Sequence, residues 1–332
     1  MTQMSAKESV LVTGGAGYIG SHACKALAKD GFLPIALDSL VSGRREHVKW
    51  GPLVVGDIAD ESLVQSLVER YALRSAIHFA AFAEVEQSME NPEQYYDNNI
   101  AKSVRFIRAL RRSNLDILVF SSSCAVYGVP TQLPVQEEML ARPVSPYGES
   151  KLTVERILQA YERAYGFRSV SLRYFNAAGA DEDNEIGENP QRSRLIPRAV
   201  EAAAGRTSEL VIYGSDYPTR DGTAVRDYVH VQDIVDAHLG ALAYLHAGGR
   251  TTACNLGTGT GYSVKEILQA VEAIAGNEIP KKLAPRRPGD PPELIADPRR
   301  ANHLFGWRPT RSDLDTMLRS AWNWHAKATL KK

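Results

Sequence analysis

A tyrosine and a lysine four residues apart, Tyr147 and Lys151, are the first candidates for chemistry in this sequence. They follow Ser145 and Pro146, which suit the cap and the first position of a helix, so both side chains are expected on one helical face. An ammonium beside a phenol stabilises the phenolate and lowers its pKa from about 10 toward neutrality. The pattern therefore predicts Tyr147 as a general base for a hydroxyl group, with Lys151 as its partner.

The position of a serine cluster supports this pair, whose spacing alone could arise by chance in a chain with 14 tyrosines. The apolar segment 117–121 is typical of a buried strand, and it runs into Ser121, Ser122 and Ser123. Ligands of α/β proteins bind at the carboxyl ends of parallel strands. Ser123 is therefore predicted to contact the same substrate oxygen as Tyr147. A serine that only forms a turn is the alternative.

A glycine-rich loop predicts a dinucleotide site. Gly14, Gly17 and Gly20 lie between the apolar segment 10–13 and a helical pattern. Glycines at these places allow a tight turn, close approach to a pyrophosphate and close helix packing. A second strand ends at Asp38, eighteen residues after Gly20. A carboxylate there accepts both adenosine ribose hydroxyls of NAD and repels the 2′-phosphate of NADP. A structural glycine turn with a helix-capping aspartate is the alternative.

The elements that position these residues alternate along the first half of the chain. Short apolar runs at 10–13, 33–37, 53–55, 76–79, 117–121 and 169–172 are the predicted strands. Segments with apolar residues at three and four spacing, 22–29, 61–71, 101–111 and 153–165, are the predicted helices. This alternation predicts an α/β fold, a Rossmann-type doubly wound parallel sheet covered on both faces.

The second half of the chain is richer in Gly, Pro, Asp and Asn, which predicts a smaller mixed α/β substrate lobe. Within it, a helical segment at 231–245 and an apolar run at 253–256 are expected to return and extend the first sheet. The predicted nucleotide-binding domain therefore comprises 1–175 plus about 228–258, and the substrate lobe comprises 176–227 and 259–332.

The composition excludes several classes of protein. The chain has 332 residues, with 39 Lys and Arg against 39 Asp and Glu, so no overall field attracts nucleic acid or acidic lipid. Its three cysteines are too far apart in sequence for a disulfide framework or a paired metal site, so no metal is predicted. The first residues form no signal core and no window is apolar enough for a membrane span, so a cytoplasmic enzyme is expected.

Motifs along the whole chain resemble those of the UDP-glucose 4-epimerases, in the extended short-chain dehydrogenase group, including a form associated with bacterial exopolysaccharide synthesis. Motifs shared widely in that group are VTGGAGYIGSH (12–22), IHFAA (77–81), YYDNN (95–99), SSSCAVYG (121–128) and SPYGESK (145–151). Motifs similar to the epimerases themselves are LRYFNAAGA (172–180), YPTRDGTAVRDYVHV (217–231), NLGTG (255–259) and APRRPGDPP (284–292).

The glycine loop and the resemblance together imply a set of side chains and backbone groups that bind NAD. They are Gly14, Gly17, Tyr18, Ile19, Gly20, Asp38, Ser39, Leu40, Val41, Ser42, Gly43, Asp57, Ile58, Phe79, Ala80, Ala81, Asn98, Tyr147, Lys151 and Phe175. A second set is implied for the UDP-sugar. It comprises Ser123, Tyr147, Asn176, Leu195, Tyr213, Arg226, Arg287 and Asp290.

Three positions depart from the family pattern. Ala83 stands where many relatives have a lysine, and Arg194 stands where many have a polar amide. Leu294 occupies a position that resembles the family's gate for bulky C2 substituents, and its intermediate size argues against N-acetylated hexoses.

The resemblance implies a homodimeric, NAD-dependent epimerase that inverts C4 of UDP-glucose or UDP-galactose. UDP-xylose and UDP-arabinose are the alternative substrates. A sugar-nucleotide 4,6-dehydratase is disfavoured because Cys124 and Ala125 stand where such enzymes carry an acidic pair. A non-catalytic NAD-binding protein with the same fold is the alternative of another class.

Overall fold

The computed structural model describes residues 7–189, 194–287 and 289–329, and the other residues of the two predicted domains lie outside the described part. The chain divides into two compact units. The first contains residues 7–122, Ser145–Leu172 and Val235–Ala253. The second contains Ser123–Val144, Arg173–Ile234 and the chain from Cys254 onward. Residues 123–144 thus group with the second unit although they lie between two strands of the large sheet in sequence.

Among the described residues, seven strands form one sheet in the order β11-β6-β5-β4-β1-β2-β3. Their bounds are β1 (Ser9–Thr13), β2 (Leu33–Asp38), β3 (Leu53–Val55), β4 (Ser75–His78), β5 (Ile117–Ser123), β6 (Arg168–Tyr174) and β11 (Thr252–Leu256). The pairs β1–β2, β1–β4, β2–β3 and β4–β5 are parallel. Each predicted strand is present, and β11, which follows α8 in the chain, lies beside β6 at one edge of this sheet. The strand order reverses between β1 and β4, which is where ligands of such sheets bind.

Helices cover the sheet because its strands are apolar on both faces; every residue of β1, for example, is buried. The helices of this part are α1 (Tyr18–Lys29), α2 (Glu61–Tyr71), α3 (Val85–Glu90), α4 (Pro92–Tyr96), α5 (Lys102–Arg112), α6 (Pro146–Tyr165) and α8 (Val231–His246). A π-helical turn, η2 (Asp97–Ala101), joins α4 to α5. The Rossmann-type fold class is confirmed.

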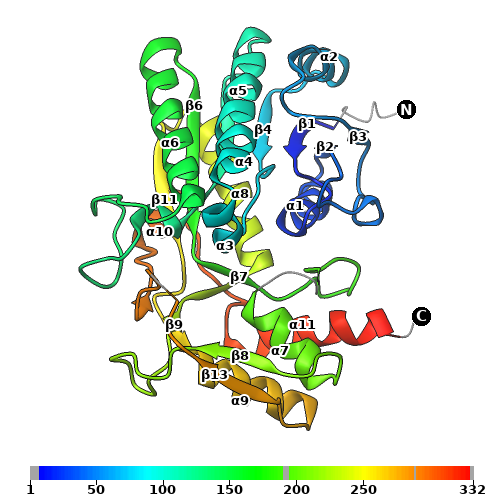
Figure 1. Ribbon diagram of the computed structural model, residues 1–332. Coiled ribbons are helices and arrows are strands. Elements are labelled where there is room, and N and C mark those ends of the chain that lie inside the picture. The colour runs from blue at the N-terminus through cyan, green and yellow to red at the C-terminus, as the bar shows by residue number, and fades with distance from the viewer. Residues whose placement is uncertain (1–6, 190–193, 288, 330–332) are drawn as a thin grey trace. The chain divides into compact units, whose positions relative to one another are not determined.

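Apolar side chains fix these helices on the sheet. Phe106 and Ile107 of α5 and Leu158 of α6 share one buried cluster with Leu11 of β1. Figure 1 shows α5 and α6 side by side over this part of the sheet. Another cluster packs Ala23 of α1 against Val235 at the start of α8. Burial of each large side chain contributes roughly 1.5–3 kcal/mol, so these faces hold the strand ends that carry the site residues.

The second unit is a mixed α/β assembly, as the composition predicted. Its strands are β7 (Asn176–Ala178), β8 (Leu210–Tyr213), β9 (Val225–Arg226), β10 (Tyr228–His230), β12 (Tyr262–Ser263), β13 (Lys281–Ala284) and β14 (Glu293–Leu294). They pair in short sheets, β10-β7, β12-β9-β14 and β13-β8. Its helices are α7 (Leu195–Ala203), α9 (Val264–Ala275), α10 (Arg299–Phe305) and α11 (Leu314–Thr329).

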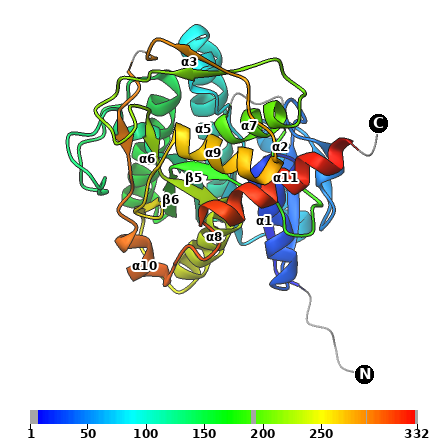
Figure 2. The same ribbon diagram turned by 90° about the horizontal axis from the view of Figure 1, so that it is seen from below.

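A helical core supports these short strands. Ile196 of α7, Leu268 of α9 and Met317 of α11 are buried in one cluster, and Figure 2 shows these helices lying together. Helix α9 begins with a capping box, in which Ser263 and Glu266 each accept a hydrogen bond from the other's backbone N–H. None of the helices in the described part of the chain is both long and apolar enough to cross a bilayer.

The buried His78 at the end of β4 generates a prediction about pH. Its Nδ1 lies 2.6 Å from Thr13 Oγ1 and its Nε2 lies 3.0 Å from Ser103 Oγ. Burial, with a smaller contribution from the Lys151 ammonium, lowers the pKa of His78 from 6.5 to about 3. As the pH falls from 6.5 toward 3, the unfolded chain binds a proton at this residue that the folded chain does not. The free energy of unfolding should therefore fall with pH, by about 1.4 kcal/mol per pH unit from His78 alone.

Chemical denaturation of the wild type and of His78→Gln between pH 6.5 and 4.5 measures this contribution. The free energy of unfolding of the variant should fall less steeply as the pH is lowered. The difference between the two slopes should correspond to about one bound proton. Equal slopes in the two proteins would contradict the assignment of His78 as a neutral, buried imidazole.

Candidate active site

The glycine loop is a tight backbone turn between β1 and α1. Gly14 has a φ of +70°, and a Cβ at this position would lie 2.8 Å from the Ala80 nitrogen. The Gly17 N–H donates to the Gly14 carbonyl, and the Ser21 N–H donates to the Gly17 carbonyl as α1 begins. A Cβ at Gly20 would lie 2.1 Å from the Gly14 oxygen. The loop therefore requires glycine for its turn and its packing, which is the arrangement a pyrophosphate needs at a helix N-terminus.

Asp38 ends β2 beside this loop. Its two carboxylate oxygens accept hydrogen bonds from the Ala16 N–H at 2.9 Å and the Leu40 N–H at 2.8 Å. A Cβ at Gly43 would lie 2.7 Å from the same carboxylate, so the 39–43 loop closes tightly over Asp38. A carboxylate offers about four lone-pair sites, so acceptor capacity remains for two hydroxyl groups. This geometry fits the ribose of NAD.

The loop after β4 is held by the π-helical turn. Phe79 N–H donates to the Thr13 carbonyl at 3.0 Å, which places residues 79–81 beside the glycine loop. Asn99 clamps the next residue, because its side chain bonds both the N–H and the carbonyl of Phe82. Asn98 donates to the Asn99 side chain at 3.1 Å. Single π-helical turns within helices are frequent at functional sites.

Asp57 lies after β3 on an open pocket of about 550 Å³. Its carboxylate accepts from the Ala59 N–H at 2.9 Å and from Lys102 Nζ at 2.8 Å. Partial burial raises the pKa of Asp57, but the Lys102 ammonium and the Ala59 N–H outweigh burial and lower it. Lys102 is a contact that the sequence did not reveal. The neighbouring Ile58 is buried, with 7% of its surface exposed.

Helix α6 presents the tyrosine and the lysine as the sequence predicted. Ser145 caps it by accepting from the Gly148 N–H at 3.2 Å, and Pro146 is the first helical residue. Tyr147 and Lys151 are both buried, and the Lys151 Nζ lies 5.8 Å from the centre of the Tyr147 ring. Both side chains therefore lie on one face of α6, and Lys151 faces the carboxyl end of β5.

The environment of Lys151 is electrostatically unusual. Its Nζ donates to the Ser121 carbonyl at 2.8 Å and lies 5.0 Å from the Phe120 ring centre. Burial lowers the pKa of Lys151 from 10.5 to about 7, and the Glu155 carboxylate opposes this by raising it. Lysines with a pKa near neutrality beside a buried phenol are typical of functional sites, so this pair is the candidate for catalysis.

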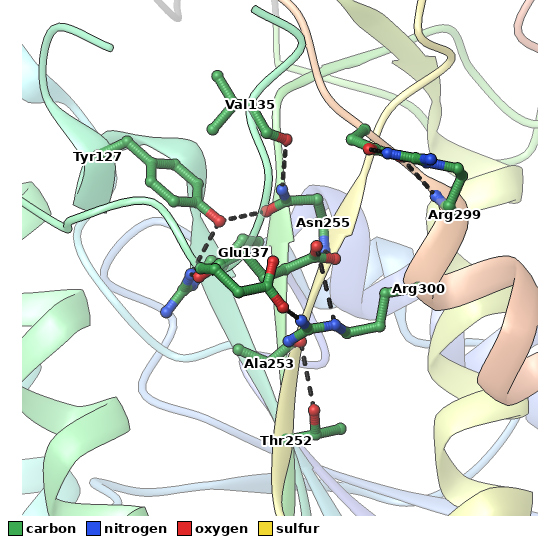
Figure 3. Close-up of polar contacts among 11 residues, drawn as sticks. Tyr127, Val135, Glu137, Thr252, Ala253, Asn255, Arg299 and Arg300 are labelled. Atoms are coloured by element: carbon green, nitrogen blue, oxygen red, sulfur yellow. Dashed lines mark hydrogen bonds and ion pairs between the residues drawn. The ribbon is translucent and has the colours of Figure 1, made fainter. Parts of the chain in front are cut away.

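Ser123 belongs to the second unit, where it caps the short helix η3 (Cys124–Tyr127) by accepting from the Ala125 N–H at 3.2 Å. The far end of η3 is fixed by the polar network in Figure 3. The Tyr127 hydroxyl donates to Asn255 Oδ1 at 2.7 Å, and Asn255 Nδ2 donates to the Val135 carbonyl at 2.9 Å. Glu137 accepts from the Asn255 N–H at 2.8 Å. This network orders the segment that carries Ser123.

Four of the predicted substrate residues gather in the second unit. Arg226 forms an ion pair with Asp290, and the Asp290 N–H donates to the Arg287 carbonyl. The Arg287 guanidinium lies 4.0 Å from the centre of the Tyr213 ring. The structure therefore brings two guanidinium groups and an aromatic ring together, a combination suited to a phosphate and a flat base.

Asn176 and Leu195, two further predicted substrate residues, lie on other elements of this unit, as do Arg194 and Leu294, which depart from the family pattern. Asn176 starts β7, and its N–H donates to the Asp227 carbonyl at 3.0 Å. Leu294 is buried in β14 in register with Arg226. Leu195 is the first residue of α7, and Arg194 before it pairs with Glu188 at 3.3 Å. The Phe175 N–H donates to the Leu256 carbonyl at 3.2 Å, and Leu195 packs against the helical core of the second unit.

Several buried polar residues escaped the sequence analysis. Asp227 accepts hydrogen bonds from Thr258, Gly259 and Ala296, and burial raises its pKa to about 6. Asp227 directly follows Arg226 in the motif at 217–231, so the sequence could have indicated its importance. Glu155, four residues after Lys151 on α6, was similarly visible as a helical neighbour.

The comparisons with known proteins agree with this geometry. A model of the NAD dependent epimerase/dehydratase family matches residues 10–257, and the chain belongs to that family. The prediction of an NAD-dependent enzyme is therefore confirmed.

Within the family, similar proteins include several UDP-glucose 4-epimerases, which confirms the predicted resemblance. The enzyme of Rhizobium leguminosarum bv. trifolii is 45% identical over 97% of this chain and 99% of its own. The crystal structure of the Brucella ovis enzyme in complex with NAD has 47% identity and a TM-score of 0.93, over 95% and 98% of the two chains. The Stenotrophomonas maltophila enzyme, with bound NAD and formylated UDP-arabinopyranose, has 39% identity and a TM-score of 0.95, over 98% and 100%.

The contact at Gly20 predicts that Gly20→Ala loses NAD. The new methyl group would meet the backbone oxygen of Gly14 at 2.1 Å, so the loop must open. Overpacking of this kind costs about 1–3 kcal/mol, and we expect about tenfold or greater weakening of NAD binding. The nucleotide released from the denatured, purified protein measures the effect.

Gly166→Asn is the matched control. Gly166 lies in the same unit, directly after α6, with a φ of +73° that Asn tolerates and open space around it. This variant should retain NAD. An equal NAD content in Gly20→Ala and the wild type would show that the loop does not hold the cofactor.

Proposed function

We propose that this protein interconverts UDP-glucose and UDP-galactose by inverting C4 of the sugar, using bound NAD. The observation that carries the proposal is the arrangement on α6, where Tyr147 lies beside an ammonium buried against the carboxyl end of β5. The family membership and the UDP-glucose 4-epimerase relatives support the reaction class.

The residues of the first unit fit NAD. Asp38 has acceptor capacity for the adenosine ribose. The glycine loop leads directly into the N-terminus of α1, where the helix dipole favours the charge of a pyrophosphate. We assign the adenine side to Asp57 and Ile58 and the nicotinamide side to Lys151. When bound, NAD supplies a reversible hydride acceptor for C4 of the sugar.

Tyr147 performs the proton transfer in this proposal. Its phenolate takes the O4 proton while C4 is oxidised, and its hydroxyl gives the proton back once the 4-keto sugar has presented its other face. Lys151 stabilises the phenolate through its positive charge. Ser123 donates a hydrogen bond to the same oxygen and orients it. Inversion follows because the sugar turns about its phosphate linkage between the two transfers.

The second unit anchors the rest of the substrate. We assign the diphosphate to the guanidinium groups of Arg226 and Arg287, and the uridine to Tyr213, Asn176, Leu195 and Asp290. Forked donors on two arginines bind phosphate oxygens well, and a firm anchor is needed if the sugar alone is to turn. The buried Leu294 supports hexoses without a bulky C2 substituent.

The chemistry of 4,6-dehydration is absent from the corresponding positions after Ser123. Burial raises the pKa of the Cys124 thiol to about 12, so it remains neutral at physiological pH. Ala125 carries no ionisable group at all. Expulsion of water from the sugar needs an acid and a base, and these two residues supply neither.

The central test uses Tyr147→Phe. Purified wild type, with no NAD added, should convert UDP-galactose to UDP-glucose, and the variant should be slower by about 10²–10⁴-fold because it lacks the proton-transfer group. Chromatography of the nucleotide sugars follows the products. UDP-arabinopyranose is assayed in parallel and is expected to react more slowly than UDP-galactose.

The control is NAD content, which is measured in both proteins because Tyr147 is also assigned to the NAD site, and activity is compared per molecule of bound NAD. The absence of any C4 epimer from either sugar, with NAD supplied to the wild type, would overturn the proposed function.

We further propose a cytoplasmic homodimer. The location is supported by the three cysteines, which are free and buried. The dimer rests on the resemblance, with α5 and α6 as the paired helices. Size-exclusion chromatography with light scattering should give about twice the 36.5 kDa chain mass. A single species of one chain mass would contradict the dimer.

A further inference from the structure

A buried carboxylate lies one helical turn beyond Lys151. Glu155 follows Lys151 by four residues on α6, so the two side chains lie on the same face of the helix. Only 2% of the Glu155 surface is exposed. Glutamate is almost never this buried unless it is paired, because removing a carboxylate from water is costly. No step of the proposed reaction uses this group directly.

Consecutive residues of β5 hold the two charged side chains. The Ser121 carbonyl accepts from Lys151 Nζ at 2.8 Å, and the Ser122 hydroxyl donates to Glu155 Oε1 at 2.5 Å. Side chains of successive strand residues point to opposite faces of a sheet. Here the backbone carbonyl of Ser121 and the side chain of Ser122 both bond to α6. The carboxyl end of β5 thus fixes the ammonium and the carboxylate together.

Neighbouring elements place titratable and aromatic groups against Lys151 and Tyr147. His78 of β4 faces Lys151, but its pKa of about 3 leaves it neutral at physiological pH. Phe120 of β5 offers its ring at 5.0 Å. Tyr95 of α4 packs edge-on against Tyr147, with 6.5 Å between the ring centres. Its hydroxyl donates to the Glu84 carbonyl and to Gln87 Oε1. Burial lowers the pKa of Lys151 to about 7, and Glu155 is the opposing influence.

We propose that Glu155 is a positioning residue that keeps Lys151 protonated during the reaction and so maintains the positive charge beside Tyr147. The inference rests on the proposed function for its catalytic meaning, but the state of Lys151 can be tested without turnover. Glu155 lies one helical turn from Lys151 and two turns from Tyr147 along α6. Its charge therefore stabilises the ammonium more than it destabilises the phenolate, and it favours the ammonium–phenolate pair over the neutral amine–phenol pair.

The direct test is an NMR titration of protein labelled with ¹⁵N at the lysine Nζ, with Lys151→Arg used to assign the resonance. E155Q keeps the size of the side chain and an acceptor for Ser122 but removes the charge. We expect the Lys151 pKa to fall by about one unit in E155Q. Glu162→Gln, the same substitution two turns further along α6, should leave it unchanged. An unchanged Lys151 pKa in E155Q overturns the proposal.

The pH dependence of kcat provides a second measurement, which would not change if Glu155 had only a structural role. The alkaline limb of the kcat profile for UDP-galactose, where Lys151 loses its proton, should shift to lower pH in E155Q by the same amount. KM should change less than about twofold, because Glu155 touches no substrate. A lower kcat with an unmoved pH profile counts against the proposal. If the wild type converts no UDP-sugar, the proposed function fails while the NMR titration still decides the role of Glu155.

Should E155Q not fold, Glu155→Asp replaces it in the same titration. Aspartate keeps the charge but withdraws it from Lys151 by one methylene. The Lys151 pKa should then fall by a fraction of a unit, less than a full loss of charge would cause. No change in this variant overturns the proposal.

Discussion

The burial of the Lys151 ammonium against β5 is the constraint on which the candidate active site depends. A charged group out of water is tolerated only with partners, and here the Ser121 carbonyl, the Phe120 ring and the Glu155 carboxylate surround it. Helix α6 must therefore start at a fixed residue and lie at a fixed height along β5. The cap at Ser145 sets that start, and the apolar face of α6 in the sheet's core sets the height.

Close backbone packing is the corresponding constraint in the glycine loop and in the loops beside it. The loops after β1, β2 and β4 meet at the carboxyl edge of the sheet, where Gly14, Gly20 and Gly43 allow distances that any side chain would block. Asp38 links two of these loops by accepting one N–H from each. The carboxylate that we assign to the ribose is thus held rigid by the same bonds that shape the loop, and a site that is already ordered binds its ligand at a lower entropic cost.

The second unit uses buried polar groups to order segments that are too short to form large sheets. Asn255 bonds both to Tyr127 of η3 and to Val135 in the segment that follows η3. Asp227, directly after β9, accepts hydrogen bonds from Thr258 and from Ala296, which follows β14. A buried carboxylate or amide with all its partners present specifies one arrangement, because any other arrangement leaves polar atoms unpaired. Strands of two or three residues such as β9 and β14 acquire a defined register in this way.

The sequence by itself determined the alternation of strands and helices, the glycine loop, the cap at Ser145 and the shared face of Tyr147 and Lys151. These features depend on local periodicity and local steric rules, which act within a few residues. Tertiary structure alone decided which polar side chains are buried together. Ser122 meets Glu155 across 33 residues of sequence and Tyr127 meets Asn255 across 128, while residues 123–144 group with the second unit. No local pattern encodes such contacts, because their energy arises only when distant segments exclude water together.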